Sequence, residues 1–261
     1  MTFGEHNPTE EDLVDRLDEI VTYLQSYPPD VRLKAMHGSY GETPNPITLP
    51  HYCLMYQMPW QAVSIQERQH LPLEFSLNAD ICELIQKCDT DESQSLDSLI
   101  YFLLKVVIIH ELAHVVMYTF VSQDTPQRFH GNGPLEANAA RGEAGDSMEM
   151  EMIGGEVNLA IPSDYTIQTI NPSDLIIVVR MTRGNEECKI LNVNTSNLTD
   201  IASGNWSHIH NLPTQPFPND FQDTKLKSKL PSLPAPSSSH HLCSYIIWEP
   251  WSDPNIPGVK R

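Results

Sequence analysis

The long apolar run from Ser95 to Ser122 constrains the fold more than any other part of the chain. It contains no Gly or Pro and is too long for an ordinary strand, so the pattern predicts a buried helix. The length would also suit a membrane span, but ionisable side chains fall in its middle: Lys105, His110, Glu111 and His114. Each would be costly in a bilayer, and we therefore expect a core helix rather than a transmembrane segment.

The five residues His110–His114, with the sequence HELAH, predict a metal site. Positions four apart share one face of a helix, so both imidazoles can bind one ion while Glu111 lies at its edge. Two His and one further protein ligand suit Zn²⁺ and leave one position for water. Zinc would lower the pKa of that water to about 7, and Glu111 could accept its proton as general base. Burying these groups in an apolar helix would be costly without such a partner.

A third ligand must come from another part of the chain, and three residues are candidates. Glu143 opens a predicted helix that ends at Ile153. Glu149 lies on the same predicted helix but about 240° further round, so these two glutamates cannot both bind one ion. His130 lies between the two predicted helices. A site built from HExxH and one further ligand is expected in each case.

The HELAH motif followed by Gly142-Glu143-Ala144-Gly145 resembles the gluzincin group of zinc metallopeptidases. It is also similar to uncharacterised fungal metallopeptidase-like proteins. In gluzincins the HExxH helix is completed by a Glu from a second helix. The resemblance, which covers about residues 99–155, implies His110, His114 and Glu143 as zinc ligands and Glu111 as the base. It also implies a zincin-like fold and a peptide or protein substrate.

The rival ligand, His130, lies 16 residues after His114 and is followed by Gly131. This spacing and the His-Gly step resemble those of the third histidine in Spartan-type proteases, which cut proteins crosslinked to DNA. Those enzymes carry basic DNA-binding parts, whereas this chain has a formal net charge of −18 and no basic cluster of comparable size. Such acidity argues against binding to a phosphate backbone or an anionic membrane as the main task. We therefore favour Glu143 over His130, and expect no nucleic-acid or membrane partner.

The remaining pattern predicts an α+β fold, in which the buried HExxH helix packs on a second helix beside a small, mainly antiparallel sheet. We interpret residues 1–261 as a single zincin-like domain with a long Pro/Ser-rich loop at about 205–239. Helices are expected at 9–26 and 78–87, and a β-hairpin at 174–193. Shorter strands are expected at 47–49, 62–65, 245–248 and 71–76, the last as an edge strand beside a substrate groove.

Cysteine usage and the N-terminus predict a cytoplasmic protein. The five Cys are odd in number, widely spaced and without a CxxC pair, which is typical of free thiols in a reducing compartment. The first residues lack the basic and apolar regions of a secretion signal. The pattern makes no prediction of oligomeric state.

The function that these features favour is zinc-dependent hydrolysis of peptide bonds. Such an enzyme also needs a group that stabilises the oxyanion, and four residues are candidates: Tyr165, His208, His210 and Tyr245. Two alternatives stay open. One is a zincin-like protein that binds a metal or a partner without catalysis. The other is a metalloenzyme of another reaction class built on two His and one carboxylate, although such a site has no need for Glu111.

Overall fold

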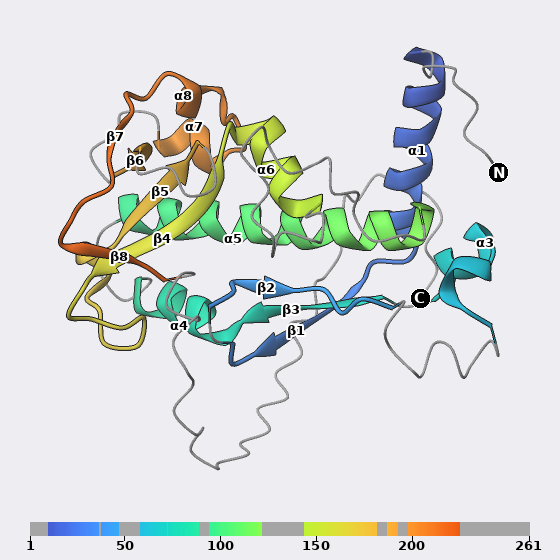
Figure 1. Ribbon diagram of the computed structural model, residues 1–261, viewed down its shortest axis with the longest axis horizontal. Helices are drawn as coiled ribbons and strands as arrows, with labels where there is room; N and C mark the ends of the chain where they lie inside the picture. The colour runs from blue at the N-terminus through green and yellow to red at the C-terminus, as the bar shows by residue number, and fades with distance from the viewer. Residues whose placement is uncertain are drawn as a thin grey trace, which may run out of the picture. The chain divides into compact units, whose positions relative to one another are not determined.

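The computed structural model describes most of the chain before residue 225, in eight stretches: 10–36, 38–46, 58–71, 73–88, 94–121, 144–181, 187–192 and 198–224. All of them belong to one contact-defined unit, Met1–Pro231. They form helices and two small sheets, so the α+β class is confirmed. Figure 1 shows these elements in order along the chain.

Helix α5 (Gln94–Val116) is the predicted long helix, and a π-helical turn, η2 (Met117–Val121), extends it. Its apolar side chains are almost completely buried at Leu99, Ile100, Phe102 and Leu103. The helix contacts α4, α6 and α7 as well as strands of both sheets. By length and composition, Leu96–Val121 could cross a membrane. Its packing against so many elements favours the interpretation as a core helix.

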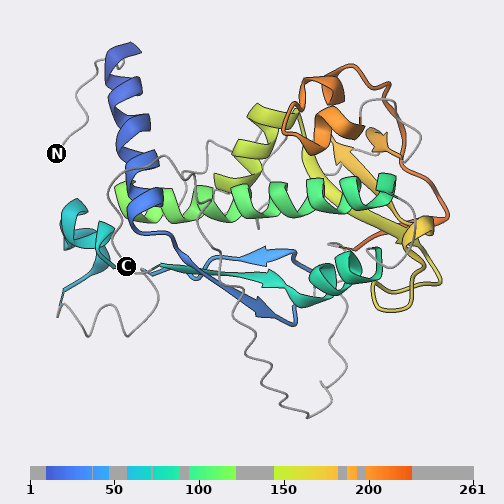
Figure 2. The same ribbon diagram turned by 180° about the vertical axis from the view of Figure 1, so that it is seen from behind.

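The first sheet has the order β1-β3-β2 and contacts α5 through β2 and β3, as Figures 1 and 2 show from opposite sides. Strand β3 (Glu74–Asn78) pairs in parallel with β1 (Asp30–Lys34) and antiparallel with β2 (Gly41–Glu42). The strand predicted at 71–76 is therefore central rather than at an edge, and this part of the prediction is wrong. The edge strands are β1 and β2, and β2 has only two residues and no alternating pattern that would predict it.

The second sheet is antiparallel, with the order β7-β6-β5-β4-β8. Its strands are β4 (Glu156–Pro162), β5 (Ile176–Arg180), β6 (Glu187–Leu191), β7 (Gln215–Pro216) and β8 (Phe221–Asp223). The pairing of β5 with β6 confirms the predicted hairpin. Residues Val157, Leu159, Ile177 and Val179 alternate along β4 and β5 and join the main core.

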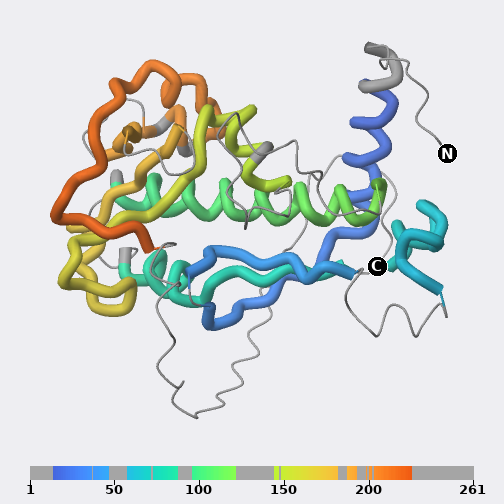
Figure 3. Tube along the Cα trace, viewed as in Figure 1, coloured from blue at the N-terminus to red at the C-terminus, as the bar shows by residue number. Residues whose placement is uncertain are grey.

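Three further helices are longer: α1 (Glu10–Ser26), α4 (Ala79–Cys88) and α6 (Ala144–Ile153), and the last two were predicted on either side of α5 in the sequence. The remaining described elements are short: η1 (Trp60–Ala62), α3 (Ile65–Gln69), η4 (Pro172–Asp174), α7 (Leu198–Ala202) and α8 (Ser207–His210). Figure 3 traces them in colour along the chain. Helix α6 ends as predicted at Gly154, which has a φ of 83°.

Three sequence predictions differ from the structure or lie outside it. The strand expected at 62–65 is instead the junction of η1 and α3, because Ser64 and Glu67 form a capping box that starts a helix. The loop expected at 205–239 contains α8, β7 and β8 in its first part, where Trp206 and Ile209 are buried. The strands expected at 47–49 and 245–248 lie outside the described residues.

Two cysteines have described surroundings, and both are free thiols. Cys188 is fully buried on β6, and Cys82 is partly buried on α4. Burial raises the pKa of each thiol, and Arg180 partly offsets this rise at Cys188. Both thiols are therefore expected to react slowly in the folded protein.

The π-helical turn η2, which extends α5, is held by Arg68, and this contact leads to a prediction about stability. Its Nε donates to the Thr119 carbonyl at 2.7 Å and its Nη1 to the Val63 carbonyl at 2.8 Å, and the residue is only 4% exposed. Arg68→Leu would leave two buried carbonyls without these donors, so we expect a loss of about 2–4 kcal/mol in the free energy of unfolding. Denaturant unfolding measures it. Arg16→Leu, at an exposed ion pair, is the control and should change stability by less than about 1 kcal/mol.

Candidate metal centre

Helix α5 carries both imidazoles of the HELAH motif side by side. The ring centroids of His110 and His114 are 5.4 Å apart, with an angle of 57° between the ring planes. The next turn adds Tyr118, whose ring stacks on His114 at a centroid distance of 6.1 Å. This aromatic neighbour was not predicted, although its spacing of four residues from His114 would have indicated it. The helical placement predicted for the two His is confirmed.

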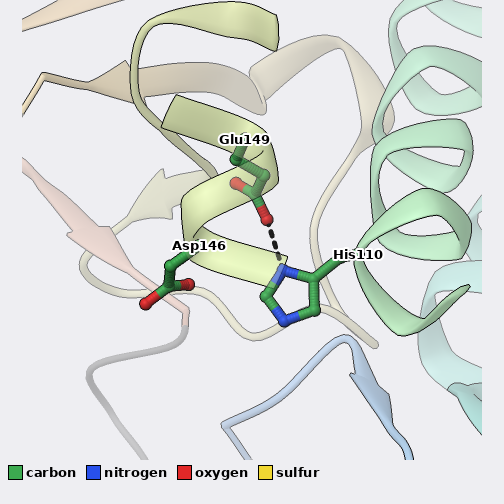
Figure 4. A group of neighbouring side chains, drawn as sticks. All are labelled: His110, Asp146 and Glu149. Carbon is green, nitrogen blue, oxygen red and sulfur yellow. Dashed lines mark hydrogen bonds and ion pairs between the residues drawn. The ribbon is translucent and has the colours of Figure 1, made fainter. Parts of the chain in front are cut away.

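His110 is held by Glu149 of α6, and Figure 4 shows the two side chains facing one another. Nδ1 of His110 lies 2.6 Å from Oε1 of Glu149, whose side chain is 2% exposed. The other oxygen, Oε2, accepts the backbone N–H of Val157 at 2.6 Å. An ionised carboxylate can only accept hydrogen bonds, so Nδ1 is the ring nitrogen that carries a proton. In the neutral ring, the lone pair then lies on Nε2.

Helix α6 approaches the ring of His110 with its backbone, at Gly145. A Cβ atom on Gly145 would overlap the imidazole of His110, so only glycine fits at this position. The close approach agrees with the extensive contact between α5 and α6. Gly145, the last residue of the Gly142–Gly145 segment, therefore allows α6 to pack against the His110 ring. The helix pair predicted from the sequence is present, and a glycine lets its members approach closely.

A third residue, Asp146, joins His110 and Glu149 in a group whose potential ligand atoms lie within 4.8 Å of one another. In Figure 4 Asp146 lies to the left of the lower part of α6 and the His110 ring to the right, with Glu149 above the ring. Asp146 was not predicted as a ligand, although its spacing of three residues from Glu149 places both on one helix face. The preferred candidate for the third ligand, Glu143, and its rival His130 both lie outside the described residues.

Glu111, the predicted general base, is buried beneath the first sheet and only 3% exposed. Thr43, one residue beyond β2, has its Oγ1 2.7 Å from Oε2 of Glu111 and 3.2 Å from the backbone carbonyl of the same residue. The backbone of Gly41 also lies against this carboxylate, because a Cβ there would overlap it. The acid of the HELAH motif therefore faces β2, whereas His110 faces α6.

The residues proposed to stabilise an oxyanion have other neighbours. Tyr165 is 41% exposed and lines a pocket between the loop before β2 and the loop after β4. His208 lies 3.0 Å from Asp200, and the carbonyl of His210 accepts a hydrogen bond from a lysine of β6. Tyr245 lies outside the described residues. These contacts place none of the three described candidates against the HELAH motif.

The donor set around His110 fits a divalent metal ion such as Zn²⁺. It offers an imidazole whose proton is fixed on Nδ1, a second imidazole on the same helix and a nearby carboxylate. A His ligand usually donates its other N–H to a carboxylate or a carbonyl, which is the role that Glu149 fills. With both oxygens already accepting hydrogen bonds, Glu149 is better suited to orient His110 than to bind an ion directly.

Comparisons of the chain with models of protein families, with curated proteins and with solved structures gave no significant match.

Proposed function

We propose that this protein is a zinc-dependent metallopeptidase, with His110 and His114 as metal ligands and Glu111 as general base. The proposal keeps Glu143, which directly precedes α6, as the third ligand. The substrate of the enzyme would be a peptide or protein. The chain's net charge of −18 favours neutral or basic segments over acidic ones.

One observation carries most of the argument: the 2.6 Å contact between Nδ1 of His110 and the buried carboxylate of Glu149. A buried carboxylate that holds an imidazole in this way is typical of the residues that support a metal ligand. The contact fixes the ring orientation and favours the tautomer in which Nε2 carries the lone pair that would bind an ion. A core histidine without a ligand needs neither a second imidazole one turn away nor a second acid, Asp146, close to it.

The residues of the chain would divide the catalytic work among them. A bound Zn²⁺ supplies a Lewis acid that activates water and polarises a carbonyl group. Glu111 accepts a proton from that water and passes it to the leaving amine. Its burial keeps bulk water away from the carboxylate, and Thr43 limits its rotation. Glu149 holds His110 through Nδ1 and is itself held by the backbone of β4.

Asp146 is a second candidate for the third ligand, because it belongs to the group around His110. Glu143 lies three residues before Asp146 in the sequence. Metal analysis of single variants separates these two carboxylates.

The experiment that tests the proposal is the metal content of the purified protein, measured by mass spectrometry. We expect about one zinc per chain in the native protein. We expect zinc to be lost in His110→Ala and His114→Ala, because each removes an imidazole. Of Glu143→Ala and Asp146→Ala, the variant that also loses zinc identifies the third ligand.

Two controls make the result specific. His208→Ala removes a histidine from another part of the structure and should leave zinc content unchanged. Glu149→Gln should lower zinc affinity by about 10–100-fold without abolishing binding, as expected for a residue that supports a ligand. Native protein without zinc, or zinc binding that is indifferent to His114→Ala, would refute the proposal.

A further inference from the structure

The contacts of Glu111 come from a segment that lies far from the HELAH motif in sequence. Thr43 has its hydroxyl oxygen 2.7 Å from Oε2 of Glu111, a distance typical of a hydrogen bond to an ionised oxygen. A carboxylate has no proton to give, so the threonine hydroxyl donates. The contact joins the residue after β2 to the C-terminal part of α5.

Gly41 packs against the same carboxylate from the strand itself. A Cβ atom on Gly41 would overlap both carboxyl and methylene atoms of Glu111, so the fit requires a bare backbone. Gly41 pairs with Leu77 of the central strand β3, and this pairing fixes the position of its backbone. Thr43 therefore restricts the Glu111 side chain by a hydrogen bond, and Gly41 restricts it by the close packing of its backbone.

The segment that carries these two residues is anchored at Tyr40, which is 4% exposed. The hydroxyl of Tyr40 accepts the backbone N–H of Leu159 at 2.5 Å and lies 2.7 Å from Oγ1 of Thr224. Its carbonyl accepts the backbone N–H of Asn78 at 2.8 Å. Tyr40 thus fixes the start of β2 both to its own sheet and to β4 of the other sheet.

Strand β4 is suited to this role because part of one edge pairs with no strand in the described structure. Strand β8 pairs only with its end, Ala160–Pro162. Before that point the backbone N–H of Leu159 bonds to Tyr40, and that of Val157 bonds to Glu149. The same edge therefore supports Glu149, which holds His110, and the segment that holds Glu111.

We propose that Tyr40–Thr43 is a positioning segment for the general base, in which Thr43 fixes the carboxylate of Glu111 by its hydrogen bond. This inference rests on the proposed peptidase function. A base that is held in one orientation loses less entropy on reaching the transition state and stays within reach of the proton that it takes. Thr43 touches neither the metal nor the substrate in this scheme, and acts only through Glu111.

The test compares Thr43→Val, which keeps the shape and removes the donor, with Thr43→Ser, which keeps the donor. We expect Thr43→Val to lower kcat for peptide cleavage by about 10–100-fold, with KM and zinc content unchanged, because the carboxylate of Glu111 then spends most of its time outside its productive orientation. Thr43→Ser should retain kcat to within about threefold, since its hydroxyl can replace that of threonine.

A second readout uses the metal-free protein and needs no activity. In a double-mutant cycle, Thr43→Val should lower Tm by about 3–8 °C when Glu111 is present. The shift should be clearly smaller in the background of Glu111→Leu, which keeps only the backbone carbonyl of residue 111, 3.2 Å from the hydroxyl, as an acceptor. Equal shifts of Tm in both backgrounds, or an unchanged kcat in Thr43→Val, would overturn the positioning role.

The outcome also separates this inference from the proposed function. If the function is wrong, the native protein and Glu111→Gln will be equally inactive on peptides, and the positioning role falls with it. If only the positioning role is wrong, the native protein will be active, Glu111→Gln inactive and Thr43→Val as active as the native protein.

Discussion

Replacing Glu111 by Gln is expected to lower the kcat of peptide hydrolysis by about 10²–10⁴-fold, the usual contribution of a general base. Gln has nearly the same shape and can still accept a hydrogen bond from Thr43, but its amide cannot take up a proton. The loss should therefore come from the chemical step rather than from folding. A screen of peptide libraries with the zinc-loaded protein, followed by steady-state kinetics on the best substrate, measures it.

The control for this substitution is Glu151→Gln, which changes an exposed glutamate of α6 in the same way. It should leave kcat within about twofold of the native value, because surface changes away from the site are usually small in effect. Zinc content and Tm should match the native protein in both variants. Equal activity of the native protein and Glu111→Gln would show that Glu111 is not a base, and the peptidase proposal would fail.

The second large effect is expected from Gly145→Ala. In an exposed helix, replacing Gly by Ala usually stabilises by about 1 kcal/mol. Here the new Cβ would overlap the ring of His110, and the close contact of α5 with α6 leaves little room for the ring to move. We therefore expect a loss of about 1–3 kcal/mol in the free energy of unfolding, as for an overpacked core. Zinc affinity should fall as well, because His110 loses its orientation.

Denaturant unfolding and zinc titration measure the two effects of Gly145→Ala. Glu151→Ala is the matched control, since it places an alanine on the exposed face of the same helix and should change stability by less than about 0.5 kcal/mol. A Gly145→Ala protein that is more stable than the native one and binds zinc normally would contradict the packing of α6 on His110.

Local patterns were sufficient to predict the helices of the site. The apolar run of α5 and the segment of α6 that ends at Gly154 follow from spacing and capping rules that act over a few residues. The β5–β6 hairpin was predictable for the same reason. The two-residue strand β2 was not, because its backbone pairing with β3 leaves no pattern of side chains in the sequence.

The sequence by itself determined that His110, Glu111 and His114 lie on one buried helix, and that the two histidines share one face of it because they are four positions apart. Only the tertiary structure decided what each of them contacts. Glu149 bonds to His110, although its place on α6 had made it a rival ligand. Gly41 and Thr43 lie against Glu111, about 70 residues away along the chain. Such contacts depend on how helices and sheets pack, and no local pattern of residues encodes that packing.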